Sequence, residues 1–154
     1  CTAQPSAPHL AVGRIGAKQL QNLATILIQT ARKRFYRIVL IHHPPASGSV
    51  SWRKRLVDAA ALRSLVARHG AELILHGHAH RTLRRCLHTP NGTVPVVGAP
   101  SISALGRTPD RRARYYIYRI TPLDADWDVR LQVRIYSPGD NRFIKESEQQ
   151  FSNQ

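Results

Sequence analysis

Two short histidine tracts are the parts of this sequence that could bind a metal ion. The first reads HHPP from His42, and the second reads HGHAH from His76. Neutral imidazoles are good ligands for Mn, Fe and Zn. A lone histidine is more often structural, but two tracts that each follow an aliphatic run favour metal binding. We expect His42, His78 and His80 to be the ligands.

The aliphatic runs before the tracts predict two strands. Residues 37–41 read RIVLI and residues 72–75 read ELIL, the pattern of strands buried on both faces. If the two strands are neighbours, His42, His78 and His80 converge at the sheet edge where α/β proteins place their sites. His76 then alternates off the ligand face and is expected to be packed. Gly77 allows the backbone to turn sharply between the two flanking histidines.

The remaining elements follow from periodicity and turn residues. Leucines and alanines at helical spacing predict a helix over 16–34. Asp58 as an N-cap and Gly70 after the last turn bound a second helix. Beyond residue 80 the period becomes two and predicts an antiparallel sheet, with strands at 94–97, 115–120 and 129–136 and a hairpin turn at 91–92. The tail, 137–154, is polar and expected to be frayed. The fold class is therefore α/β, arranged as an α+β sandwich.

Composition and charge narrow the classes of partner. The chain has 154 residues, enough for one core, and 23 Lys and Arg against 9 Asp and Glu give a formal net charge of +14. This excess favours anionic partners such as phosphate esters, nucleic acid or acidic lipid. We expect no membrane span, because no apolar run is long enough. The two cysteines form no disulfide framework, and a cytoplasmic location is the expectation.

The two tracts, with the strands that precede them, resemble a known family. Residues 40–45 (LIHHPP) and 75–80 (LHGHAH) are similar to the last two signature blocks of the calcineurin-like metallophosphoesterases, in the same order and with a helix between them. The GRIG sequence at 13–16 and the Gln19-Leu20 pair resemble bacterial members. The resemblance covers about residues 1–120.

This resemblance implies metal-dependent hydrolysis of phosphate esters, by a phosphodiesterase or phosphatase with a four-layer fold. In the family, two divalent ions (Mn, Fe or Zn) form a dinuclear centre, so His42 and His78 would bind one ion and His80 the other. His43 would touch the substrate or support His42 from behind. Arg81 would contact phosphate or be an ordinary exposed arginine. The catalytic histidine of the family lies in its N-terminal half, so no catalytic residue is assigned here.

The sequence departs from the family in one respect. It has no Asp-x-His, Gly-Asp-x-x-Asp or Gly-Asn-His block, which would supply the acidic ligands. We therefore interpret residues 1–154 as a fragment, the C-terminal part of one domain whose N-terminal half is absent or belongs to a partner polypeptide. Alone it should be inactive. Exposed aliphatic strand faces would favour association with the missing half or a homo-oligomer.

Two other interpretations remain open. One is a basic nucleic-acid-binding module with structural histidines, although aromatic residues make up only 6% of the chain and no recognised motif interleaves them with basic residues. The other is a single zinc ion held by His42, His78 and His80. The residues leave the substrate open among cyclic nucleotides, nucleotide pyrophosphates, phosphomonoesters and nucleic acid, and they do not choose the metal.

Overall fold

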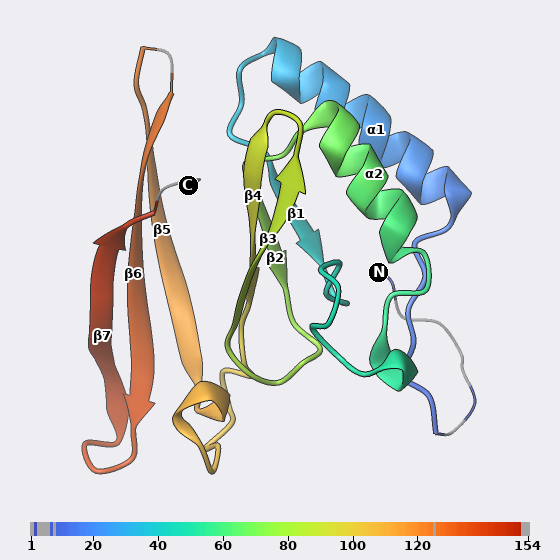
Figure 1. Ribbon diagram of the computed structural model, residues 1–154. Coiled ribbons are helices and arrows are strands. Elements are labelled where there is room, and N and C mark those ends of the chain that lie inside the picture. The colour runs from blue at the N-terminus through green and yellow to red at the C-terminus, as the bar shows by residue number, and fades with distance from the viewer. Residues whose placement is uncertain (1, 3–6, 8, 125, 152–154) are drawn as a thin grey trace.

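The computed structural model describes residues 2, 7, 9–124 and 126–151. Within them the chain has a mixed α+β fold in three layers, in which the helices lie on one sheet and a second sheet lies on the opposite side (Figure 1). The elements are α1 (Ala17–Arg32), β1 (Ile38–Ile41), α2 (Ala59–His69), β2 (Leu73–His76), β3 (Leu83–Thr89), β4 (Gly92–Gly98), β5 (Arg114–Pro122), β6 (Trp127–Ser137) and β7 (Arg142–Gln150). Two 3-10 turns occur at Trp52–Lys54 and Pro109–Arg111.

The first sheet positions the histidine tracts. Its strand order is β1-β2-β4-β3, with β1 parallel to β2 and β2 parallel to β4. The register sets Ile41 opposite His76, so the residues that follow the two strands leave the sheet together. This arrangement confirms the two neighbouring strands expected from the sequence. β1 is an edge strand, because nothing among the described residues pairs with its other side.

The helices cover one face of this sheet (Figure 1). Leu62 and Val66 lie one turn apart on α2 and are both 0% exposed, in one cluster with Leu27 of α1. Gly70, at φ 75°, ends α2 as predicted. Asp58 precedes α2 as expected but does not cap it with its side chain, since its carboxylate accepts the N–H groups at the start of α1. No helix in the described ranges has the length and hydropathy to cross a bilayer.

The second sheet is antiparallel, in the order β5-β6-β7. Val129, Leu131 and Val133 of β6 are at most 4% exposed and form its inner face. The prediction of a frayed tail over 137–154 is wrong for Arg142–Gln150. These residues form β7 and pair with residues 130–137 of β6. Cross-strand pairing orders this segment even though its own sequence is polar. Residues 152–154 lie outside the described residues.

Two further expectations are corrected. β1 is not buried on both faces. Val39 and Ile41 face the helices, whereas Ile38 is 39% and Leu40 is 76% exposed on the other face, where no described element covers them. The predicted strand at 94–97 belongs to the mixed sheet, not to the antiparallel one, because it pairs with β2. Its hairpin partner β3 was not predicted. The turn that joins the two lies at 90–91, one residue before the predicted 91–92, because Gly92 already pairs with Thr89.

The core assignment can be tested with two leucines. Replacing Leu62 with Ala should lower the free energy of unfolding by about 2–5 kcal/mol, because it leaves a cavity in a fully buried site. Leu40→Ala removes the same atoms from an exposed side chain and should cost less than about 1 kcal/mol. Urea unfolding followed by circular dichroism measures both. Equal losses would contradict this core.

Candidate metal centre

The parallel pairing of β1 with β2 brings two histidines of different tracts together. His42 follows β1, and its carbonyl accepts the N–H of Gly77, 3.2 Å away, which follows β2. His78 Nδ1 then lies 3.2 Å from His42 Nε2, with the ring centres 5.0 Å apart. The structure therefore places side by side two of the three residues that the sequence predicts as ligands. Their role as ligands stays a prediction.

The second tract has an unusual backbone. His78 and His80 have φ values of 62° and 50°, in the left-handed region that non-glycine residues seldom adopt. Such conformations cost of order 1–3 kcal/mol each and cluster at functional sites. They turn the chain twice within three residues, with Ala79 N–H donating to the Gly77 carbonyl at 2.7 Å.

His80 stands apart from the other two predicted ligands. Its side chain is exposed, and among the described residues no contact joins it to His42 or His78. Across all the residues that the structure describes, no group of three or more His, Cys, Asp or Glu side chains is arranged to hold a metal ion. The described site is therefore a pair of imidazoles with a third histidine on the adjoining turn.

His43 is held inside the protein. It is 2% exposed, its Nε2 lies 3.2 Å from the Ala11 carbonyl and its Nδ1 lies 2.7 Å from Thr2 Oγ1. Because a carbonyl only accepts, Nε2 carries the proton and Nδ1 accepts the Thr2 hydroxyl. Both nitrogens are thus engaged, which does not favour the predicted substrate contact and favours the supporting role. Its ring centre lies 4.1 Å from that of His78.

Gly13 makes room for His43. A Cβ at this glycine would lie 2.3 Å from the His43 ring, closer than atoms can approach. Gly13 also pairs with Leu56 in an isolated parallel bridge. The segment before α1 therefore passes directly behind His43.

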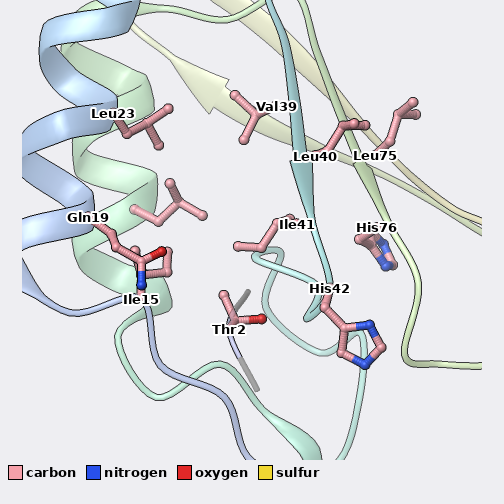
Figure 2. A pocket seen from close by; sticks show the side chains of 11 residues that line it. Thr2, Ile15, Gln19, Leu23, Val39, Leu40, Ile41, His42, Leu75 and His76 are labelled. Carbon is pink, nitrogen blue, oxygen red and sulfur yellow. The ribbon is translucent and has the colours of Figure 1, made fainter. Parts of the chain in front are cut away.

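His76 is packed, as its position in the strand indicates. It is 6% exposed, and a Cβ at Gly98 would lie 2.4 Å from its ring. Nδ1 donates to the Gly77 carbonyl at 3.0 Å, which leaves Nε2 unprotonated, buried and without a partner among the described residues. With His42 it lines a cavity of about 510 Å³ beside β1, otherwise mainly apolar (Figure 2).

Arg81 follows the second tract and is half-buried. Its guanidinium donates to the Ser49 carbonyl at 3.3 Å, which links the loop after β2 to the loop after β1. The next residue, Thr82, donates its N–H to the Asp110 carbonyl. These contacts fix the turn that carries His80. The phosphate-binding role of Arg81 stays a prediction.

The electrostatic setting favours neutral imidazoles. Burial, reinforced by the neighbouring His43 and His42, lowers the pKa of His78 to about 4. Burial also lowers the pKa of His43 and of His76. A neutral imidazole keeps a lone pair for a metal ion. The Nε2 atom of His78 is buried, and a backbone contact of this ring with Lys54 opposes the lowering of its pKa without cancelling it.

Sequence reasoning missed two residues that shape this region. Thr2 lies 41 positions from His43, and no local pattern signals a contact over that distance. Gly98 could have been found, because a glycine that ends an aliphatic strand often marks a close approach.

Comparison with known proteins shows a shared fold. The structure is similar to the crystal structure of a dimetal phosphatase from Danio rerio, with a TM-score of 0.60 and 15% sequence identity. The similarity covers 90% of this chain and 38% of that enzyme's chain, so this chain spans well under half of the phosphatase. No family model matches the sequence, and no curated protein matches it. At 15% identity the likeness shows the fold alone.

The lowered pKa of His78 predicts a stability that depends on pH. An unfolded chain has the ordinary pKa of 6.5, whereas the folded value is about 4. Between these pH values His78 is more often protonated in the unfolded chain than in the folded one. The free energy of unfolding should therefore fall as pH decreases from 6.5 towards 4. His78→Gln should flatten this decline, and His9→Gln, at an exposed histidine, should not. Urea midpoints measured across this range in chelator test it, and an unchanged decline in His78→Gln would contradict it.

Proposed function

We propose that this chain is part of a two-metal phosphoesterase and supplies the histidine ligands of its metal centre. The observation that carries the proposal is the pairing of His42 with His78 at the ends of adjacent parallel strands, in a fold similar to that of a dimetal phosphatase. His80 would serve the second ion from the turn that follows. The reaction class is hydrolysis of a phosphate ester.

The described residues fit part of such a centre. The environment of His78 favours a neutral ring, and its Nε2 atom is buried. Nitrogen donors of this kind suit Mn, Fe or Zn. Two divalent ions there would supply the positive charge that stabilises an in-line displacement at phosphorus. His43 holds its own ring against His78 through Thr2 and Ala11, and in this way it orients the pair.

Carboxylate ligands would have to come from outside this chain. No described Asp or Glu joins the histidines, and the fold corresponds to 38% of the zebrafish phosphatase chain. We propose that further polypeptide of the same fold covers the free edge of β1. The aliphatic side chain of Leu40, 76% exposed, and the mainly apolar cavity beside it support this proposal, since such surfaces favour association.

The test compares this chain with a longer polypeptide that carries its natural upstream sequence. We expect the longer protein to hold about two metal ions, as found in dinuclear hydrolases, and to cleave bis(p-nitrophenyl) phosphate with added Mn²⁺. His78→Ala should remove the activity and most of the bound metal. Metal analysis and release of nitrophenol measure these two quantities.

The control is His88→Ala, which changes an exposed histidine on β3 and should leave both quantities unchanged. A longer protein that binds no metal would overturn the proposal. So would full activity in His78→Ala, because the paired histidines would then have no part in catalysis.

A further inference from the structure

The outer face of the β5–β7 sheet combines aromatic and basic side chains. In Figure 1 one side of this sheet faces the first sheet, and no helix lies on the other side. Strand pairing places alternate residues of the three strands on that outer side. We call it the outer face, and its residues are Tyr115, Ile117, Arg119 and Thr121 of β5, Asp128, Arg130, Gln132, Arg134 and Tyr136 of β6, and Phe143, Lys145, Glu148 and Gln150 of β7.

Three aromatic rings gather at one end of the outer face. Phe143 lies edge to face against Tyr115, with ring centres 5.1 Å apart, and against Tyr136, at 5.6 Å. All three rings are half-buried, so part of each stays open to solvent. Because Val129, Leu131 and Val133 form the packed inner face, these rings are not needed for the core. They offer surfaces on which flat ligands could stack.

Basic side chains lie beside the rings and farther along the same face. Arg134 lies opposite Tyr115 on one side and opposite Lys145 on the other, and Arg119 lies opposite Arg130. These four cations share the face with two carboxylates. Asp128 pairs with Arg130 at 3.3 Å and Glu148 with Lys145 at 2.5 Å, whereas Arg119 and Arg134 form no ion pair with a described carboxylate. The face therefore keeps a positive excess, in a chain whose net charge is +14.

The composition of the outer face argues against a covering helix. A sheet face that packs under a helix carries aliphatic residues at alternate positions. Here the central strand β6 carries Arg130, Gln132 and Arg134 at those positions, and Arg130 is exposed. This pattern indicates a surface that meets water or a polar, anionic partner.

We propose that the outer face binds single-stranded nucleic acid, with bases stacked on Tyr115, Tyr136 and Phe143 and phosphates near Arg119 and Arg134. An antiparallel sheet with stacking aromatic and basic side chains suits unpaired bases, because every base has a flat face and every linkage a negative charge. Arg114, next to Tyr115 in β5 but on the inner face, donates to Thr82 Oγ1 in the segment after the second histidine tract. The binding itself requires no metal.

The test measures fluorescence anisotropy of labelled oligo(dT) and oligo(rU), each of about 12 nucleotides, which is within the range of known single-strand sites. Chelator is present, so metal-dependent cleavage plays no part. The double variant Tyr136→Leu with Phe143→Leu keeps apolar bulk but removes stacking. It should weaken binding about tenfold or more, since each stacked base contributes roughly 1–3 kcal/mol. Its affinity for polyphosphate, which has no bases, should not change.

The charge contribution has its own readout. Arg119→Gln with Arg134→Gln should reduce the dependence of log K on log salt concentration by about 0.7 for each phosphate that these arginines neutralise. The matched control is Arg32→Gln with Lys33→Gln, two exposed basic residues at the end of α1. Its affinity and salt slope should stay close to those of the original chain.

Several results would overturn the proposal. One such result is a leucine variant that binds oligo(dT) and oligo(rU) as tightly as the original chain. Another is an α1 control that loses as much affinity as the arginine variant. Photo-crosslinking of 5-bromouracil oligonucleotides gives a readout that needs no variant. Crosslinks on β5, β6 or β7 support the proposal, and crosslinks confined to other elements contradict it. Loss of binding in the longer polypeptide would mean that the face is covered, which also overturns it.

Discussion

The parallel pairing of β1 with β2 is the constraint on which the candidate site depends. It sets Ile41 opposite His76 and joins the Gly77 N–H to the His42 carbonyl, so the two histidine tracts begin at the same level of the sheet. A shift of one residue would turn every side chain of the shifted strand to the other face. His42 and His78 would then no longer meet. The aliphatic residues of β2, of which Leu73 and Ile74 are fully buried, keep this register.

Packing behind the histidines determines their chemical state. Gly13 and Gly98 leave space for the rings of His43 and His76, and the segment that contains Ala11 supplies a carbonyl to His43. Burial then lowers the pKa of His43, His76 and His78, which keeps the three rings neutral. The lone pair of His43 is taken up by the Thr2 hydroxyl. The turn at His78 and His80 keeps a costly left-handed backbone. The ends of β1 and β2 thus carry neutral histidines on a strained turn, and no described acidic residue joins them in a metal-binding group.

Local patterns predicted the elements that carry the histidines, because each strand is a short aliphatic run that ends at a tract. They did not predict β3 or β7. β7 reads RFIKESEQQ, and it becomes a strand only by pairing with β6. The aromatic cluster was not predicted either. Tyr115, Tyr136 and Phe143 come from three strands and meet only in the folded sheet. The contact of Thr2 with His43 likewise depends on tertiary structure.

The metal-binding role proposed for His42 and His78 can be tested on this chain directly. The most direct measurement is a titration of Zn²⁺ into the chain labelled with ¹⁵N-histidine, followed by the chemical shifts of the ring nitrogens. We expect the ring nitrogens of His42 and His78 to shift together and saturate together, while those of His43, already hydrogen-bonded on both sides, keep their tautomer. Shifts confined to His9 and His88, with His42 and His78 unchanged, would show that the histidine pair does not bind the ion.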